Sequence, residues 1–420
     1  MTEMKDKLYW IWLSLIFPYG SNKPYRIITE FGPPEDFFRL SMEGMGRLGF
    51  FTLHDLESAK AKKIEDAQKI VDECGRLGIE IVTFEDERYP QRLREIYAPP
   101  MVLYTLGDIS GLDEEPVIAM VGTRRETEYS NSVTGWLAKG LAEAGAVVVS
   151  GCAVGLDAAA HVGAIQGGGR TIGVLGCGLD VDYPYQNRKL KLKILEKGAL
   201  ISELPPGTEP NRGVFPVRNR ILAGLSLGVV VTHAPERSGS LITADHALDN
   251  GRDVFCVPPY SIFDPGFFGV VKYLRQGATP VFSPEDILAP YLTQFPDKLK
   301  PKRITGDYVP SLSAEKGKPA PRVRSVSKIS DSKEKKAPAD NAEKTVLFRQ
   351  KWEEQNSDFF SSFDENQLLV YNNLESEPKF VDELAALTKL PVGVLFSVLT
   401  EFEIAGLVRS YSGQRYGLSG

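Results

Sequence analysis

Two short apolar runs in this chain each end at polar residues that could bind an anion. The first run, 117–121, is followed by Arg124, and the second, 146–149, is followed by Ser150. An arginine can hold a phosphate through two parallel hydrogen bonds, and glycine lets a ligand approach the backbone closely. The pattern therefore predicts a phosphate-binding site at the ends of these two apolar runs. Its predicted residues are Gly122, Thr123, Arg124, Ser150 and Gly151.

A second basic group follows the third apolar run. It comprises Tyr185, Arg188 and Lys189. The two basic side chains could bind phosphate, and the tyrosine ring could stack on a base. The alternative is an ordinary solvated helix start, and the sequence leaves both interpretations open.

Two arginines lie close together before an apolar helix, in the order Arg218-Asn219-Arg220. Side chains two residues apart on a helix point to different faces. One arginine could thus face the ligand while the other pairs with a carboxylate such as Glu203 or Asp157. The sequence does not say which. We count all three residues as candidate site residues.

Two further clusters are candidates for binding or for chemistry. Ser238, Gly239 and Ser240 precede another helix, where they could bind phosphate or where Ser240 could cap the helix. Asp157 and His161 are four residues apart on one helical face, a spacing compatible with acid–base chemistry. No matching nucleophile is evident, so we favour a buried polar network. We expect no catalytic residues, no metal and no cofactor.

The elements that position these residues alternate between strand and helix. We predict strands at 117–121, 146–150, 171–175, 199–202, 228–232 and 253–257. The residues 131–144 have apolar side chains at helical spacing. This alternation predicts an α/β fold with a Rossmann-like doubly wound sheet, in which ligands bind where the parallel strands end. Residues 79–115 are predicted to extend the sheet.

The chain divides into four predicted parts. Residues 1–78 are a small all-α domain, 79–295 the Rossmann-like domain, 296–362 a basic disordered linker, and 363–420 a winged helix. The formal net charge is −6, but residues 298–336 hold 12 Lys and Arg against 4 Asp and Glu, a net of +8. Proline and polar residues dominate this stretch, as is typical of disordered linkers.

The last part reads as three helices followed by a β-hairpin around 412–413. Its third helix, 392–404, contains no Lys or Arg but does contain Glu401 and Glu403. Phosphates would repel these carboxylates, so we favour a protein partner over DNA for this helix.

The four cysteines, Cys74, Cys152, Cys177 and Cys256, show no metal-ligand spacing and indicate no disulfide framework. The apolar run 8–17 faintly resembles a signal peptide, but no small-residue cleavage site follows it and it suits one face of a helix. We therefore expect a cytoplasmic protein with no membrane segment.

Several short motifs together resemble the bacterial DNA-processing protein A family (DprA/Smf). The order and spacing hold over roughly 170 residues. The matching segments are 121–124, 150–157 with His161, 171–180, Tyr183-Pro184 with Asn187, 200–203, 215–220, 238–244 and Gly277-Ala278. One departure is Val154, where the family usually has arginine.

The resemblance implies a set of properties that the residue patterns alone do not. It implies single-stranded DNA binding without catalysis, protection of incoming DNA and loading of the RecA recombinase in natural transformation, and a homodimer through the α/β domain. It also implies that the family's arginine at Arg124 contacts DNA, and that the N-terminal domain is sterile-alpha-motif-like.

An enzyme acting on small nucleotides is the alternative. Related α/β folds hydrolyse nucleoside phosphates with a Gly-Gly-x-Gly-Thr loop and a glutamate on the next helix. The equivalent segment here is 237–243, followed by Asp245. This departure favours the DNA-binding hypothesis.

Overall fold

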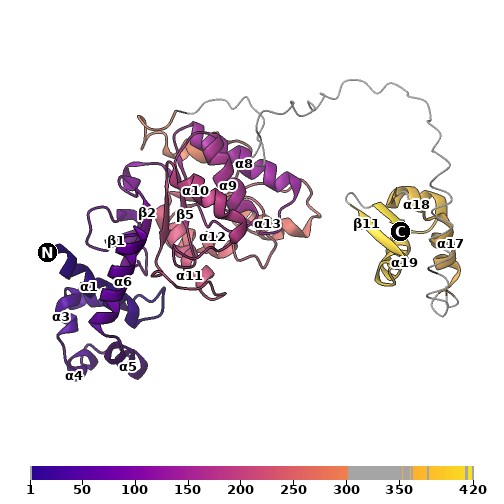
Figure 1. Cartoon of the computed structure of the whole chain (residues 1–420). Coiled ribbons are helices and arrows are strands. Elements are labelled where there is room, and N and C mark those ends of the chain that lie inside the picture. Colours follow the sequence, from indigo (N-terminus) through magenta and orange to yellow (C-terminus); the bar gives the residue numbers. More distant parts are fainter. Residues whose placement is uncertain are drawn as a thin grey trace. The chain divides into compact units, whose positions relative to one another are not determined.

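The structure, a computed structural model, describes residues 2–300, 352, 360, 363–375, 378–411 and 415–418. They belong to two compact units, Met1–Lys318 and Pro319–Gly420 (Figure 1). Almost all of the basic linker predicted for 296–362 lies outside the described residues.

A nine-stranded sheet forms the centre of the first unit, in the order β1-β2-β6-β5-β4-β3-β7-β8-β9. Strands β3 to β9 pair in parallel, and β1 and β2 add an antiparallel edge. All six predicted strands of the α/β region are present, so the predicted fold class is confirmed. The strands are β1 (Glu80–Thr83), β2 (Val102–Gly107), β3 (Val117–Val121), β4 (Val147–Ser150), β5 (Thr171–Val174), β6 (Ala199–Ser202), β7 (Gly228–Val231), β8 (Asp253–Cys256) and β9 (Thr279–Pro280).

Helices cover both faces of this sheet. Alternate residues of β3 show this: Ile118 and Met120 pack with α8 and α9, whereas Ala119 and Val121 pack with α11 and α12. A strand buried on both faces must be apolar throughout, which explains its sequence. The helices are α7 (Gln91–Arg94), α8 (Glu128–Glu143), α9 (Leu156–Gln166), α10 (Arg188–Leu195), α11 (Val214–Leu225), α12 (Leu241–Asp249), α13 (Phe268–Arg275) and α14 (Pro284–Leu288).

The strand order reverses direction at β3. The chain passes from β3 to β4, β5 and β6 on one side, and then returns to β7 on the other side. The loops after β3 and β7 therefore separate, and a crevice forms between them at the carboxyl ends of the strands. This reversal determines where the candidate site lies.

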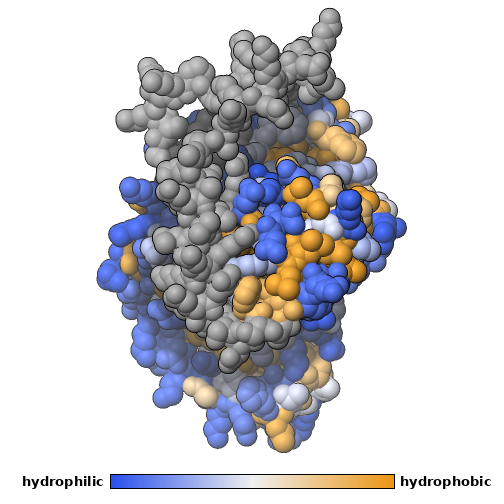
Figure 2. All heavy atoms as spheres, turned by 90° about the vertical axis from the view of Figure 1, so that its right-hand side faces the viewer, coloured by the Kyte–Doolittle hydropathy of each residue, from blue (hydrophilic) through white to orange (hydrophobic). Residues whose placement is uncertain are grey.

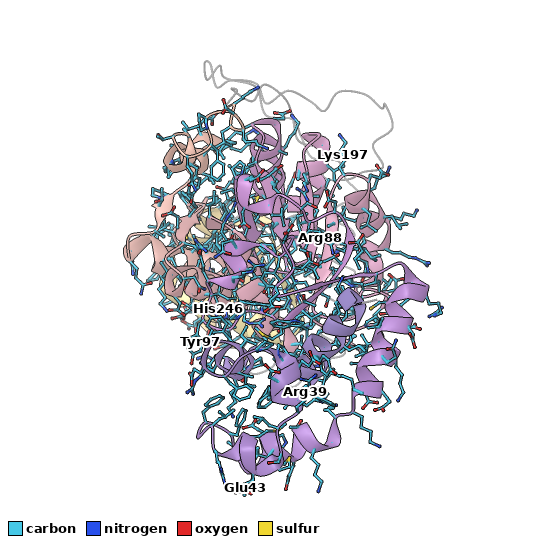
Figure 3. All side chains as sticks on the ribbon, turned by 90° about the vertical axis from the view of Figure 1, so that its left-hand side faces the viewer. Arg39, Glu43, Arg88, Tyr97, Lys197 and His246 are labelled. Atoms are coloured by element: carbon cyan, nitrogen blue, oxygen red, sulfur yellow. The ribbon has the colours of Figure 1, made fainter. Side chains whose placement is uncertain are left out.

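The N-terminal part is entirely helical, but it packs directly on the sheet. Trp10 of α1 stacks on Phe84, with ring centroids 6.1 Å apart, and one hydrophobic core joins α1 and α6 to β2. The boundary predicted at residue 78 is therefore not a break in packing. Figure 3 shows this part, with Arg39 and Glu43 on its surface. Its helices are α1 (Thr2–Ile16), α2 (Lys23–Glu30), α3 (Pro34–Phe38), α4 (Met42–Gly46), α5 (Leu53–Ala61) and α6 (Ile64–Leu77).

The second unit contains the predicted winged helix. Leu384, Leu399 and Phe402 are fully buried in its core. Its third helix exposes Glu401 and Glu403, and Gln367 Nε2 donates to Glu401 Oε2 at 2.6 Å. The elements are α17 (Glu365–Asn373), β10 (Lys379–Phe380), α18 (Val381–Thr388), α19 (Val392–Ile404), β11 (Val408–Tyr411) and β12 (Arg415–Leu418), with the sheet order β10-β12-β11.

Most large apolar side chains are buried, but several remain exposed in both units. Figure 2 shows one side of the molecule, where hydrophobic residues gather between hydrophilic ones. Exposed apolar surface of this kind often marks contacts with a partner. Examples are Tyr260, Ile262, Phe263, Phe268 and Phe282 in the first unit and Leu368, Leu369, Phe380 and Leu387 in the second. Among the described residues, no helix is long and apolar enough to cross a membrane.

Candidate nucleic-acid interface

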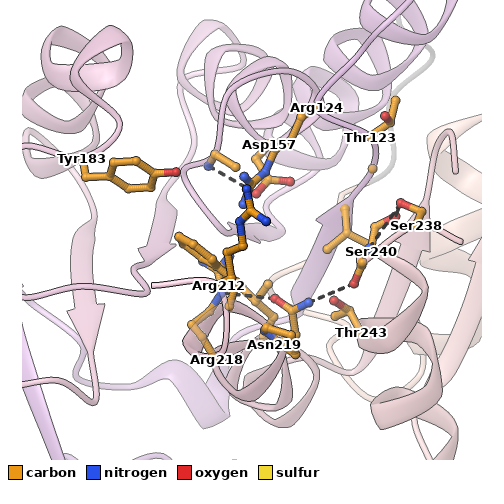
Figure 4. A pocket seen from close by; sticks show the side chains of 17 residues that line it. Thr123, Arg124, Asp157, Tyr183, Arg212, Arg218, Asn219, Ser238, Ser240 and Thr243 are labelled. Atoms are coloured by element: carbon orange, nitrogen blue, oxygen red, sulfur yellow. Dashed lines mark hydrogen bonds between the residues drawn. The ribbon is translucent and has the colours of Figure 1, made fainter. Parts of the chain in front are cut away.

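A cavity of about 580 Å³ opens at the point where the strand order reverses (Figure 4). It lies at the end of β3 and between the first turns of α11 and α12. Eight of the predicted site residues line it: Gly122, Thr123, Arg124, Arg218, Asn219, Ser238, Gly239 and Ser240. The fold thus brings together residues that are more than a hundred positions apart in the sequence.

Two exposed arginines supply positive charge to this cavity. Arg124 follows β3, and Arg212 lies on the loop before α11. Asn211 fixes that loop, because its side-chain oxygen accepts from the backbone N–H groups of Gly213 and Val214 at 3.0 and 3.1 Å. In the part of the chain that the structure describes, neither arginine forms an ion pair with a carboxylate. Both guanidinium groups are therefore available to an anionic ligand.

Arg218 is a third positive charge, but it is buried. Its guanidinium donates to Gly151 O at 2.8 Å and also to Val174 O, so it ties the ends of β4 and β5 to α11. Burial lowers the pKa of Arg218, and the negative charge of Asp157 opposes this change. Arg218 contributes charge to the cavity from beneath while its donors stabilise the fold.

Gly151 is required by the side chains around it. A Cβ atom at this position would lie 2.5 Å from Arg218 Nη2 and 2.6 Å from Asp157 Oδ2. Any larger residue would therefore displace the buried arginine and carboxylate. Burial raises the pKa of Asp157, although the charge of Arg218 lowers it in part. Gly151 itself lines a small cavity of about 30 Å³ that adjoins the main one and also includes Val154.

The opposite wall of the cavity carries hydroxyl groups at the start of α12. The hydroxyls of Ser238 and Ser240 lie 2.8 Å apart, and Asn219 Nδ2 donates to Gly239 O at 3.1 Å. Thr243 is fully buried, and its Oγ1 has no hydrogen-bond partner among the described residues. Helix N-termini favour anions because their N–H groups are free. This wall is therefore suited to a phosphate.

Arg220 lies on a different face of α11 from Arg218. It is buried, and its guanidinium forms two hydrogen bonds with the carboxylate of Glu203, at 2.6 and 2.8 Å. Its Nε also donates to Ala98 O at 2.9 Å. The structure therefore resolves the alternative that the sequence left open: Arg220 pairs with Glu203 and does not line the cavity.

Four other predicted site residues lie outside the main cavity. The hydroxyl of Ser150 is buried and donates to Met120 O at 2.7 Å, which is a structural contact. Tyr185, Arg188 and Lys189 are exposed on the segment after β5. Arg188 Nε lies 3.8 Å from an Asp182 carboxylate oxygen. These three residues are accessible to a ligand that extends beyond the cavity.

Several of the lining residues were not predicted as site residues, among them Arg212, Tyr183 and Phe215. The family motifs include Tyr183 and Phe215, which was the only signal for them. Arg212 lies on an irregular loop with no recognisable pattern. The tertiary packing alone brings it to the cavity.

His161 is part of a buried polar network, as favoured from the sequence. Its Nδ1 lies 2.7 Å from Thr171 Oγ1, and its Nε2 lies 3.4 Å from Cys152 Sγ. The Thr171 hydroxyl donates to Val148 O at 2.7 Å, so it accepts from His161 Nδ1–H. Burial lowers the pKa of His161 to about 3. A proton-transfer role near neutral pH does not suit this environment.

The low pKa of His161 predicts acid sensitivity. In the unfolded chain the imidazole has a pKa near 6.5, so the unfolded state gains a proton below that pH while the folded state stays neutral until about 3. His161 therefore costs stability as the pH falls from 6.5 towards 3, by about 2 kcal/mol at pH 5. Thermal melts at pH 7 and pH 5 should show a smaller loss for His161→Gln than for the wild type. An equal loss would contradict this origin.

The chain combines a winged helix with a Rossmann-like sheet, and the sheet carries a cavity lined by arginine and hydroxyl side chains. Two family models match the chain: DNA recombination-mediator protein A over residues 80–291 and the DprA winged helix domain over 361–414. The chain is 44% identical to the DNA processing protein DprA of Bacillus subtilis over 210 residues, which cover 50% of this chain and 70% of that protein.

Two further comparisons extend this similarity. Protein Smf of Synechocystis is 30% identical over 429 residues and covers 98% of both chains. The X-ray structure of DNA processing protein A from Streptococcus pneumoniae has a TM-score of 0.59 at 34% identity, covering 68% of this chain and 96% of that one. The chain belongs to the DprA/Smf family, and its role is DNA processing in recombination.

Proposed function

We propose that this protein binds single-stranded DNA in the cavity at the strand-order reversal, protects it, and loads RecA recombinase onto it without itself catalysing a reaction. The observation that carries this proposal is the cavity lining. Arg124 and Arg212 are exposed and pair with no carboxylate among the described residues, and the hydroxyl groups at the start of α12 also line the cavity. Such a lining suits the phosphates of a nucleic acid.

The shape of the site supports a preference for single strands. The donors line the inside of a cavity of about 580 Å³ and do not form a convex surface that could enter a groove. A duplex is stiff over roughly 150 base pairs and cannot bend into such a space, whereas a single strand can. Beyond the cavity, Arg188, Lys189 and Tyr185 are exposed and would contact the continuing strand.

Loading of RecA can be tested separately from strand binding. RecA filament formation should be followed on a single strand coated with single-strand-binding protein, with and without this protein. We expect faster assembly, measured as an earlier onset of RecA ATP hydrolysis. Unchanged onset at concentrations that saturate the strand would reject RecA loading and leave strand binding untouched.

We also propose a homodimer that forms through the Rossmann-like domain, as the family resemblance implies. Ile262, on the loop before α13, and Phe268, the first residue of α13, are exposed and apolar. Together with Val271 and Lys272 of the same helix they line a cavity of about 590 Å³. Apolar surface of this kind suits a second copy of the chain. The mass measured by light scattering at micromolar concentration should be twice that of one chain; a single-chain mass would contradict the dimer.

For the winged helix we propose a protein partner. Its third helix, α19, has exposed carboxylates at Glu401 and Glu403 and no basic residue. Two apolar side chains, Leu387 of α18 and Val394 of α19, are also exposed. Removing residues 363–420 should therefore leave single-strand affinity unchanged in a binding titration, and a marked loss would indicate a DNA contact.

A nucleotide-hydrolysing enzyme is the second candidate, because the α12 segment is the counterpart of a catalytic loop in related folds. Asp245 stands where such an enzyme would need a placed glutamate. Its carboxylate accepts a hydrogen bond from the Tyr273 hydroxyl, so it is held by the fold. We expect no release of free base from nucleoside monophosphates; measurable release would support the enzyme instead.

Thr243 gives a specific prediction, because its buried hydroxyl has no partner among the described residues. Thr243→Val should leave the melting temperature equal or slightly higher, since a buried unpaired polar group costs roughly 1–3 kcal/mol. The same change should weaken single-strand binding roughly tenfold, because a hydrogen bond to a charged phosphate is lost.

Thr134→Val is the matched control for this variant. Thr134 is also buried, but its hydroxyl donates to Ser130 O at 2.7 Å. This control should lower stability and leave DNA affinity unchanged. If Thr243→Val bound DNA as tightly as the wild type, the hydroxyl wall would not be a phosphate site.

A further inference from the structure

Helix α11 has two faces, and only one of them lines the main cavity. Four of the lining residues have the helical spacing i, i+3, i+4 and i+7, namely Phe215, Arg218, Asn219 and Leu222. Val217 belongs to the same turns of the helix but is not among the lining residues. Together with Arg220 it forms the opposite face. Whatever packs against the opposite face therefore affects where α11 places its cavity residues.

The N-terminal turn, residues 18–21, joins α1 to α2 and packs against Val217. The N–H of Ser21 donates to Pro18 O at 3.1 Å and closes the turn. Gly20 has a φ of +83°, as the third residue of such a turn often does, and this conformation favours glycine. A Cβ atom at Gly20 would lie 2.8 Å from Val217 Cγ1. The backbone of the turn therefore contacts a side chain of α11 directly.

A second contact joins the N-terminal turn to α11 through Glu203. Tyr19 and Glu203 line the same small cavity of about 20 Å³. Burial, together with the charge of Glu203, raises the pKa of Tyr19 to about 12. Glu203 in turn forms two hydrogen bonds with Arg220, at 2.6 and 2.8 Å. The turn thus meets the opposite face of α11 at two points, one apolar and one polar.

The N-terminal turn is held at both ends. Before it, α1 is anchored to the sheet by the stacked rings of Trp10 and Phe84. After it, Lys23 Nζ donates to the buried carboxylate of Asp55 at 2.5 Å. On the other side of the contact, a valine in a helix has essentially one favourable rotamer, so Val217 cannot turn away. A change of size at this contact must therefore move α11 itself.

We propose that the N-terminal turn is a positioning element of the strand-binding site: Gly20 holds Val217 and thereby sets where α11 places Arg218 and Asn219. This role rests on the proposed single-strand binding. Gly20 and Val217 are positioning residues, because neither lines the main cavity. The N-terminal helical part thus acts on the affinity for the strand without contacting the DNA.

The first test adds a methyl group at this contact in the full chain. Gly20→Ala should weaken binding of a labelled single-stranded oligonucleotide roughly fivefold, as substitutions that couple to a distant site typically do. Alanine at this φ also strains the backbone. Gly49→Ala is the matched control, because Gly49 has a φ of +77° and nothing lies within 4 Å of its added Cβ. The control should show a similar loss of melting temperature and unchanged affinity.

The second test restores the space. Val217→Ala combined with Gly20→Ala removes the methyl groups that the new side chain would meet, so the double variant should regain the affinity of the wild type. The backbone strain at residue 20 remains, so its melting temperature should stay low. A positioning role thus predicts that affinity and stability separate. If affinity instead followed the melting temperature through all these variants, the contact would be structural only and the proposal would be overturned.

Val217→Ala alone covers the case in which Gly20→Ala does not fold. It leaves a gap at the contact and should weaken strand binding about threefold. Its control is Val133→Ala, at a half-buried valine of α8 that packs on a different core. Equal affinity of these two variants would overturn the positioning role and leave strand binding intact. Failure of the wild type to bind the single strand would overturn the proposed function as well.

Discussion

Replacing Arg124 and Arg212 together with alanine is expected to weaken single-strand binding by roughly a hundredfold. Each guanidinium would lose a charge-assisted hydrogen bond to a phosphate, and two such losses amount to about 3 kcal/mol. Both side chains are exposed and unpaired with carboxylates in the described structure, so the folded protein should keep its stability. Fluorescence anisotropy with a labelled oligonucleotide measures the affinity, and a thermal melt measures the stability.

The matched control is Arg39→Ala, at the residue that follows α3. Arg39 is an exposed arginine that pairs with Glu35 at 2.5 Å and lies on the helical N-terminal part, away from the cavity. The substitution removes one positive charge and leaves the cavity unchanged, so the affinity for the single strand should hardly change. If the double variant bound like this control, the cavity would not be the DNA site. The single variants should each show an intermediate loss.

Breaking the buried ion pair between Arg220 and Glu203 is expected to cause the largest loss of stability. Glu203→Gln leaves a buried guanidinium without its counter-charge, which typically costs about 3–5 kcal/mol. The side chains are only 7% and 12% exposed, so water cannot replace the lost partner. Chemical denaturation measures the free energy of unfolding directly.

A double variant tests whether the loss of stability comes from the unpaired charge. Arg220→Met with Glu203→Gln removes the unpaired charge, so the double variant should be more stable than the sum of the single losses predicts. Arg26→Ala, which breaks the exposed pair with Glu30, is the control and should change stability little. A loss from Glu203→Gln no larger than that of the control would show that the buried pair contributes nothing.

The strands of the α/β region could be predicted from the sequence because they are buried on both faces. A strand such as β3 must be apolar at every position, and that makes a run such as Val117–Val121 easy to recognise. The packing of the N-terminal helices on β1 and β2 could not be predicted in the same way. It depends on contacts such as Trp10 with Phe84, which leave no periodic signal.

Part of the candidate site could also be predicted from the sequence, because the strand and helix pattern determines where some residues lie. Residues at strand ends and helix starts, such as Arg124 and Ser240, have positions that the α/β pattern determines. Arg218 and Arg220 are two apart on one helix, so only the fold shows that the first lies beneath the cavity and the second pairs with Glu203. Arg212 lies on a loop, and no pattern of residue types distinguishes it from a solvated arginine.

The most direct test of the central claim is a salt titration of binding to a single-stranded and a duplex oligonucleotide of the same sequence. Arg124, Arg212, Arg188 and Lys189 provide four exposed positive charges, which predicts a slope of about −3 for the logarithm of affinity against the logarithm of salt concentration. We expect tight, salt-sensitive binding to the single strand and much weaker binding to the duplex. Equal affinity for the two, or no binding at low salt, would contradict the proposed function.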